Sequence, residues 1–192
     1  MTSRPEADLV ERLRAFVSTA AIFSMVFGLS GLLGWALNLP ALVTWEDENV
    51  VAPNAAACFL LVGLSLLLLG EKDNRPLTQV RRLTALASAA VVGLVGSLTL
   101  AELMSGRNLG IDRLLLVRSP DLPIAAAGIV MSPVAAGAFV LLSLALLVID
   151  WRTRGEKWPA QFICLAAAFA PVFGVLGWIL GSGAPRWLGL PR

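Results

Sequence analysis

Four charged residues that could bind a polar ligand occur in one short stretch of the chain, at the end of an apolar segment. They are Glu102, Arg107, Asp112 and Arg113. Charge beside a hydrocarbon phase is costly and often marks a functional site. Glu102 can also simply pair with Arg107 or Arg113. The stretch therefore predicts either a shallow polar pocket or a set of structural ion pairs.

The rest of the composition argues against catalysis. The chain has no His, so imidazole ligation of a metal or haem is excluded. Lys72 and Lys157 lie between apolar segments, where neither can form a buried Schiff base. Cys58 and Cys164 lie inside separate apolar segments, and we expect them to be small packing residues. No nucleophile–base pair, phosphate loop or dinucleotide fingerprint occurs, so we expect no enzyme, no cofactor and no metal.

The elements that must position these residues are membrane helices. Hydrophobic residues make up 57% of the 192 and charged residues 15%, against about 25% charged in a soluble domain. A membrane helix needs about 20 mostly apolar residues, and five segments approach that length. We predict an all-α integral membrane protein, with a cytoplasmic or interfacial lead of residues 1–14 and a single transmembrane domain of residues 15–192. Its expected spans are at about 15–37, 53–69, 83–104, 132–149 and 160–180.

The distribution of positive charge predicts the orientation of these spans. Ten of the fifteen Lys and Arg residues fall in the N-terminal lead and in the connectors after the second and fourth segments. The remaining five fall on the other side. Because positive residues favour the cytoplasmic face, we expect a cytoplasmic N-terminus and an extracytoplasmic C-terminus. The charged stretch from Glu102 to Arg113 would then lie at the outer face.

A repeat relates the segments to one another. The stretch VAPNAAACF begins the second segment, and MSPVAAGAF begins the fourth at an offset of 80 in the numbering. An offset of 81 relates the third segment to the fifth, and the first segment joins partly through Gly34 and Trp35. Pro53 and Pro133 suit the first turn of a helix, where the missing N–H has no cost. The chain therefore predicts about two and a half helical-hairpin repeats.

Small residues recur at four-residue spacing in the third and fifth segments. Such rows allow helix backbones to approach closely in lipid. They predict either packing within the chain or a surface for a second copy or a partner subunit. The helix-packing ridges are Ala85, Ala89, Gly93, Ser97, Ala101, Ala166, Ala170 and Gly174.

The motifs APNAAACFLLVGLSLLLL, RRL, LGIDRLLL and MSPVAAGAFVLLSLALLV together resemble a known kind of membrane region. They are similar to the N-terminal input regions of certain bacterial sensor histidine kinases and diguanylate cyclases, over about residues 30 to 190. The resemblance implies a dimeric inner-membrane input module. This chain departs from the pattern in having Val134 where the first copy has Asn54, and in having no output domain within its 192 residues. We expect either the input region of a longer sensor or a five-span protein that acts through partners.

Three functions follow from these observations as expectations. The first is a non-catalytic sensor or input module of the bacterial inner membrane. The second is a small accessory or assembly subunit of a larger membrane complex, docked through the small-residue ridges. The third is a transporter, since internal repeats are common in transporters. For all three we expect the lipid bilayer and a second copy or membrane subunits as partners, and no nucleic acid.

Overall fold

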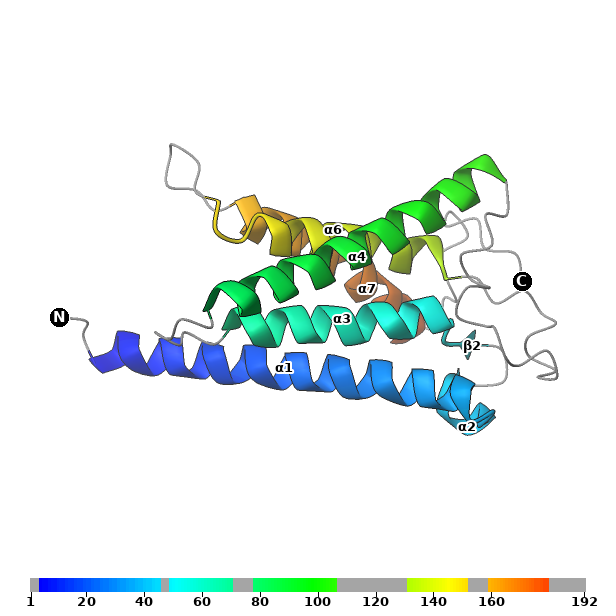
Figure 1. The fold of residues 1–192 in the computed structure, drawn as a ribbon, viewed down its shortest axis with the longest axis horizontal. Helices are drawn as coiled ribbons and strands as arrows, with labels where there is room; N and C mark the ends of the chain where they lie inside the picture. The colour runs from blue at the N-terminus through cyan, green and yellow to red at the C-terminus, as the bar shows by residue number, and fades with distance from the viewer. Residues whose placement is uncertain (1–3, 46–48, 71–77, 107–130, 152–158, 180–192) are drawn as a thin grey trace.

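The chain forms an elongated bundle of helices that run alternately in opposite directions (Figure 1). The computed structural model describes residues 4–45, 49–70, 78–106, 131–151 and 159–179. The long helices are α1 (Arg4–Ala36), α3 (Pro53–Gly70), α4 (Thr78–Ser105), α6 (Pro133–Leu147) and α7 (Pro159–Ile179). A short helix α2 (Pro40–Val43) and the paired strands β1 (Thr44–Trp45) and β2 (Asn49–Val50) connect α1 to α3.

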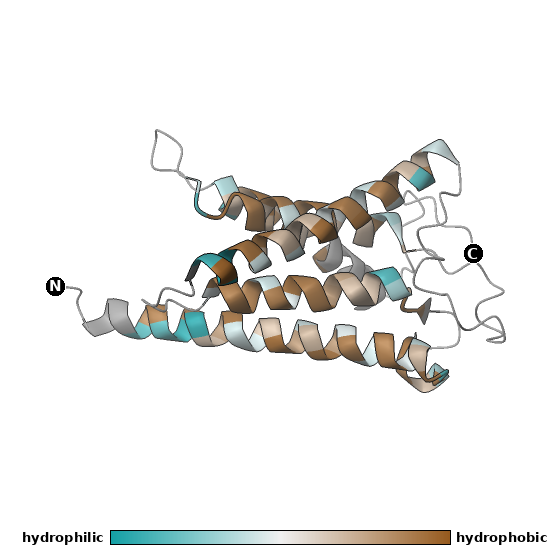
Figure 2. Cartoon of the chain, in the orientation of Figure 1, coloured by the Kyte–Doolittle hydropathy of each residue, from teal (hydrophilic) through white to brown (hydrophobic). Residues whose placement is uncertain are grey.

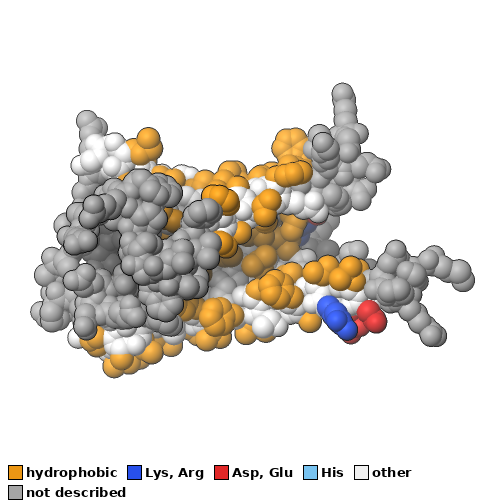
Figure 3. Space-filling view, turned by 180° about the vertical axis from the view of Figure 1, so that it is seen from behind, with side chains coloured by type: hydrophobic (Ala, Val, Ile, Leu, Met, Phe, Trp, Pro, Cys, Tyr) orange, Lys and Arg blue, Asp and Glu red, His pale blue; other side chains and the backbone are white. Residues whose placement is uncertain are grey.

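Three of the helices are long and apolar enough to cross a membrane. These segments are Asp8–Ala36, Pro53–Gly70 and Gln79–Ser105, while α6 and the Pro159–Phe169 part of α7 are apolar but shorter. Hydrophobic residues line the helices along most of their length (Figure 2). Apolar side chains also cover much of the described surface, with charged ones near one end (Figure 3). A surface of this kind suits lipid rather than water. The described part of the chain is therefore all-helical apart from the small hairpin, and it has the features of a multi-pass membrane protein.

The helices begin where local chemistry predicts. Pro53 and Pro133 are the first residues of α3 and α6. Ser132 caps α6, because its hydroxyl accepts a hydrogen bond from the backbone N–H of Ala135 at 3.2 Å. In α3 the side chain of Asn54 accepts one from the N–H of Ala55 at 2.9 Å. The two related starts thus satisfy their backbone donors with different residues.

Two helices begin earlier than the hydropathy pattern predicts. Helix α1 starts at Arg4, so most of the polar lead is helical, and α4 starts at Thr78 rather than near residue 83. The added turns contain Glu, Arg, Leu and Gln, which all have high helix propensity. Hydropathy marks the part of a helix that can lie in lipid, while propensity extends the helix beyond it.

The connection from α1 to α3 is a compact structure at the end of the bundle where α3 begins. Asn38 adopts a left-handed conformation with φ of 57°, and the N–H of Leu39 donates to the carbonyl of Gly34 at 2.8 Å. This arrangement is typical of a helix C-terminus. The indole N–H of Trp35 then donates to the carbonyl of Val51 at 2.9 Å. We call this end of the bundle the Trp35 end, and the opposite end, where α4 begins, the Arg82 end.

The core lies between α3, α4 and α6. Its buried residues include Cys58, Val92, Met131 and Phe139, and Phe59 packs against it. The rings of Phe27, Phe59 and Phe139 form two edge-to-face contacts with centroids 5.0 Å apart. Phe59 and Phe139 are equivalent in the repeat with the offset of 80, so two copies of one motif residue meet in the centre.

The pairs α1 with α3 and α4 with α6 approach each other at equivalent positions. A Cβ atom on Gly28 of α1 would lie 2.5 Å from the carbonyl oxygen of Ala56. One on Gly96 of α4 would lie 2.9 Å from the carbonyl oxygen of Ala136. The offset in numbering is 80 from Ala56 to Ala136 and 68 from Gly28 to Gly96. Glycine is needed at both places because a larger residue would force the helices apart.

A second equivalent contact fixes the correspondence. Gly63 of α3 lies against the carbonyl of Ala21, and Ser143 of α6 donates a hydrogen bond to the carbonyl of Ala89 at 2.7 Å. The offset is again 80 from Gly63 to Ser143 and 68 from Ala21 to Ala89. The same two offsets therefore describe both contacts. On this alignment, Thr99 and Glu102 of α4 correspond to Gly31 and Gly34 of α1.

Candidate functional site

Glu102, the first residue of the predicted polar site, lies in the last turn of α4 at the Trp35 end and is buried. It is 9% exposed, and Thr99, one turn before it, is 0% exposed. Both continue the buried face of α4 that earlier contains Ala89 and Val92. Residues three apart lie on the same face of a helix. Thr99 and Glu102 therefore form one polar patch at the end of an otherwise apolar packing face, and we call them the α4 polar pair.

Both side chains of the α4 polar pair have an unsatisfied oxygen. Among the residues that the structure describes, the Thr99 hydroxyl and the Glu102 Oε1 have no hydrogen-bond partner. Ser105 donates to the backbone carbonyl of Glu102 at 3.4 Å, a bond that does not involve the carboxylate. Burial of an unpaired polar group costs about 1–3 kcal/mol, and more for a charged group. The arrangement can accept a hydrogen-bond donor or a positive charge.

A third unsatisfied hydroxyl, that of Thr44, belongs to the hairpin between α1 and α3. Two buried serine hydroxyls in the described part of the bundle are paired. Ser65 donates to the carbonyl of Ala85 at 2.9 Å, and Ser143 donates to that of Ala89. These unpaired groups are thus near one end of the bundle, while the serines in its middle bond across helices.

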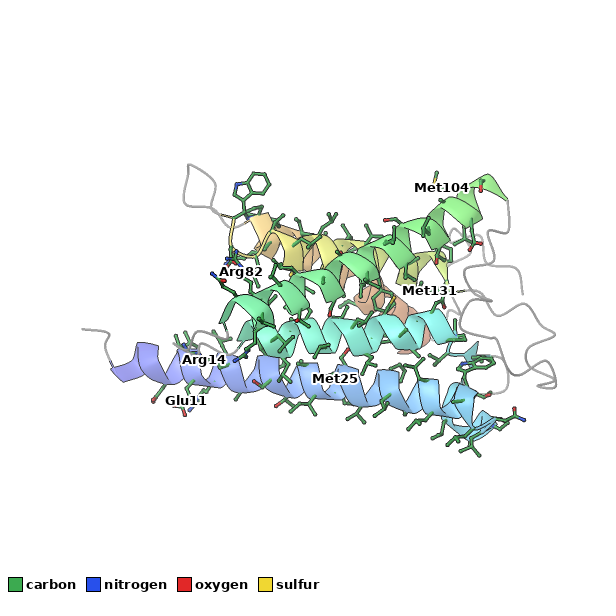
Figure 4. All side chains as sticks on the ribbon, in the orientation of Figure 1. Glu11, Arg14, Met25, Arg82, Met104 and Met131 are labelled. Atoms are coloured by element: carbon green, nitrogen blue, oxygen red, sulfur yellow. The ribbon has the colours of Figure 1, made fainter. Side chains whose placement is uncertain are left out.

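The other three residues of the predicted site, Arg107, Asp112 and Arg113, lie outside the described residues. The described arginine side chains are at the Arg82 end, as Figure 4 shows for Arg14 and Arg82, whereas Met104, two residues after Glu102, lies at the Trp35 end. Arg82 pairs with Asp150 at 2.8 Å, and Arg81 donates to the carbonyl of Leu68 at 3.3 Å. No arginine whose side chain is described donates to Oε1 of Glu102.

The ion pair at the Arg82 end is exposed, whereas Glu102 at the Trp35 end is buried. The side chains of Arg82 and Asp150 are 57% and 63% exposed. An exposed pair of this kind contributes about 0–1 kcal/mol. Its structural effect is to connect the first turn of α4 with the C-terminal end of α6, and Arg81 connects the same turn with α3.

The structure places the predicted helix-packing ridges in different surroundings. Ala85 and Ala89 are buried against the hydroxyls of Ser65 and Ser143, and Gly93 lies against Ser143. Ser97 and Ala101 are exposed, as is Ala166 on α7. The side chains of Ala170 and Gly174 are outside the described set. Only the first three residues of the α4 row therefore pack within the described part of the chain.

Sequence reasoning identified Glu102 but missed Thr99, Ser65 and Ser143. Single hydroxyl residues in an apolar segment are common and carry no clear signal. Thr99 could have been found from its spacing, because it lies seven residues after Val92 and three before Glu102. Among the described residues there is no group of three metal-binding side chains.

The chain matches no known protein family, and no characterised protein or solved structure is significantly similar to it. Its function must therefore be inferred from its own sequence pattern and structure.

Proposed function

We propose that this protein is a non-catalytic input module, which receives a signal at the outer face of the bacterial inner membrane. The observation that carries the proposal is the α4 polar pair. Thr99 and Glu102 are buried at one end of the bundle, each with an oxygen that has no partner among the described residues. Such groups are rare in helices exposed to lipid and often mark binding sites. A site that receives a ligand from outside needs unsatisfied groups of this kind.

The proposal includes five spans, with the N-terminus in the cytoplasm. Helix α6 has 15 residues, which at about 1.5 Å per residue is shorter than the roughly 30 Å hydrocarbon layer. Its direction is nevertheless the same as that of α3, and it packs against α3 and α4 along the bundle (Figure 1). The matching contacts of α1 with α3 and α4 with α6 support a repeated hairpin. The excess of Lys and Arg in the lead and two connectors supports the orientation.

Helix α4 is the element that could carry a change from one face to the other. It contains the α4 polar pair in its last turns and Arg81 and Arg82 in its first turns. At the Arg82 end these arginines contact the C-terminal ends of α3 and α6. A shift of α4 on ligand binding would therefore alter the contacts of two other helices at the cytoplasmic face. Helix shifts of about 1–2 Å are a common form of such a transition.

Spin labels at the cytoplasmic end test the proposal directly. Labels would replace the exposed Leu13 of α1 and the exposed Leu83 of α4, after Cys58 and Cys164 are changed to alanine. The distance between the labels would be measured by pulsed electron resonance in lipid nanodiscs. Glu102→Gln removes the buried charge without changing the side-chain shape. An input module predicts that this substitution shifts the distance distribution by about 2 Å.

The matched control is Glu11→Gln, which removes an exposed carboxylate from α1. It should leave the label distance unchanged. If Glu102→Gln also leaves it unchanged, the outer end of α4 does not communicate with the cytoplasmic end, and the sensor proposal is wrong.

One observation favours the second candidate, an accessory subunit of a membrane complex. Ser97 and Ala101 are small and exposed on the face of α4 that its contacts with α3 and α6 leave free. Small residues at such positions allow another helix to approach closely. Purification from native membranes in mild detergent tests this candidate. A partner of fixed stoichiometry that is lost with Ala101→Leu would support it, and a complex unaffected by that substitution would oppose it.

A further inference from the structure

The α4 polar pair differs from the polar contacts in the middle of the bundle. The hydroxyls of Ser65 and Ser143 bond to backbone carbonyls, but Thr99 Oγ1 and Glu102 Oε1 have no partner among the described residues. Buried polar groups in proteins are almost always paired. An unpaired buried oxygen costs more on a carboxylate than on a hydroxyl, because the carboxylate carries charge. A donor or a positive charge at Oε1 of Glu102 would remove this cost.

Packing does not require polar residues at these positions. In the equivalent pair of helices, Gly31 and Gly34 of α1 occupy the places of Thr99 and Glu102. A Cβ atom on Gly31 would meet the side chain of Ala56, and one on Gly34 would meet those of Val43 and Leu42. At this level of the bundle, α1 therefore makes apolar contacts with its neighbours. Helix α4 has a hydroxyl and a carboxylate at the equivalent positions.

The chemistry of the pair specifies the charge of the ligand. One carboxylate balances one positive charge, and the hydroxyl adds a neutral oxygen ligand. Divalent ions such as Ca²⁺ take about six to eight oxygen ligands, commonly with several carboxylates. The described residues contain no group of three acidic, His or Cys side chains that could supply such a site. The pair therefore fits a monovalent cation.

We propose that Thr99 and Glu102 bind a monovalent cation at the outer end of α4. The carboxylate neutralises the ion, and the threonine oxygen supplies a second ligand one helical turn away. This inference rests on the proposed function in so far as it names the signal, but binding is measured separately from signalling. A carboxyl group that held a proton instead of a cation would make the unfolding temperature independent of the cation. The test therefore distinguishes a bound cation from a bound proton.

The experiment measures thermal unfolding of the purified chain in detergent. Sodium, potassium or ammonium chloride is compared with N-methyl-D-glucamine chloride, at constant pH, ionic strength and chloride concentration. A ligand that binds only the folded state raises the unfolding temperature. At a cation concentration well above the dissociation constant, the expected rise for the wild type is on the order of 5 °C with at least one of the three ions.

Three variants make the result specific. Glu102→Gln should abolish the cation-dependent rise, and Thr99→Val should weaken the apparent affinity by roughly tenfold, the effect of losing about 1.4 kcal/mol. Glu11→Gln, which removes an exposed carboxylate, should keep the full rise. The proposal is overturned if none of the three ions stabilises the wild type, or if Glu102→Gln responds as the wild type does.

The outcome also separates this inference from the proposed function. A cation response that disappears in Glu102→Gln, with unchanged label distances at the cytoplasmic end, would establish the binding site and remove the sensor role. A change in the label distances without any cation response would support the sensor role and remove the cation.

Discussion

The pair α1 with α3 and the pair α4 with α6 contact each other at equivalent positions through different residues. In the first pair Gly63 of the second helix leaves room for Met25 of the first. In the second pair Ser143 occupies the place of Gly63, and Gly93 occupies that of Met25. The larger residue is therefore on the first helix in one pair and on the second helix in the other. The comparison shows that equivalent positions stay in contact, while the side chain that fills the space between them is exchanged.

The hydrogen bonds across the two pairs follow the same exchange. In the first pair Ser24 of α1 donates to the carbonyl of Phe59 on α3 at 2.7 Å. In the second pair the donor is Ser143 of α6, and the acceptor is Ala89 on α4. The pairs differ most at the Trp35 end, where Gly31 and Gly34 correspond to the α4 polar pair. The second pair thus combines equivalent packing contacts with two buried oxygens that have no partner among the described residues.

The largest expected effect is a clash at the glycine contacts. Gly28→Ala should destabilise the chain by about 3 kcal/mol, because the added Cβ would lie 2.5 Å from backbone atoms of Ala56 and Leu60, which cannot move alone. Gly96→Ala should cost about 1–2 kcal/mol, since its nearest backbone atom is 2.9 Å away. Unfolding in mixed detergent measures both.

The control for these substitutions is Gly137→Ala, where an added Cβ has no atom within 4 Å among those described. Helix propensity alone should make this variant more stable by up to about 1 kcal/mol. An equal or larger cost at Gly96 than at Gly28 would contradict the ranking.

A double substitution sharpens the comparison by converting one pair into the other. Gly93→Met alone should cost about 2–3 kcal/mol, because it meets the Ser143 side chain. Combined with Ser143→Gly, it recreates the arrangement of Met25 and Gly63. The two changes should therefore couple by about 1–2 kcal/mol in a double-mutant cycle. Additive costs would show that the two contacts are not equivalent.

A smaller effect is expected for the two serines. Ser24→Ala and Ser143→Ala each remove one hydrogen bond between helices, and each should cost about 0.6 kcal/mol. The acceptor carbonyls belong to helices and keep their helical partners, so no backbone group is orphaned. Equilibrium unfolding of both variants checks that the costs agree. A loss for either one well beyond the range measured for single hydrogen bonds between membrane helices would mean that the serines do more than join two helices.

The smallest effect is expected at the Arg82 end, outside both packed contacts. Arg82→Gln should change stability by less than about 0.5 kcal/mol, because the ion pair with Asp150 is exposed and screened. Unfolding at low and high salt measures this contribution. Asp150→Asn should behave in the same way. A loss comparable to that of Gly96→Ala would instead give the Arg82 end a share in holding the bundle together.

Local features of the fold were predictable from the sequence. The starts of α3 and α6 follow from Pro53, Pro133 and Ser132, because proline geometry and a serine cap act within one turn. The hairpin of β1 and β2 was not predicted, since two-residue strands have no periodic pattern. Glu102 was found because a charge in an apolar segment is conspicuous. Its partner Thr99 was not, because a single hydroxyl is common in such segments.

By itself the sequence determined that the chain is helical and suited to lipid, because length, hydropathy and helix-start chemistry are local properties. Only the tertiary structure decided which face of each helix packs. Between residues 83 and 101, helix α4 has apolar or small residues all round. Lipid is as apolar as another helix, so hydrophobicity does not distinguish the faces of this part. The approach of α6 at Gly96 selects Ala89 and Val92 for the interior and leaves Ser97 and Ala101 exposed. The same choice buries Thr99 and Glu102, and so places two polar residues on one packed face.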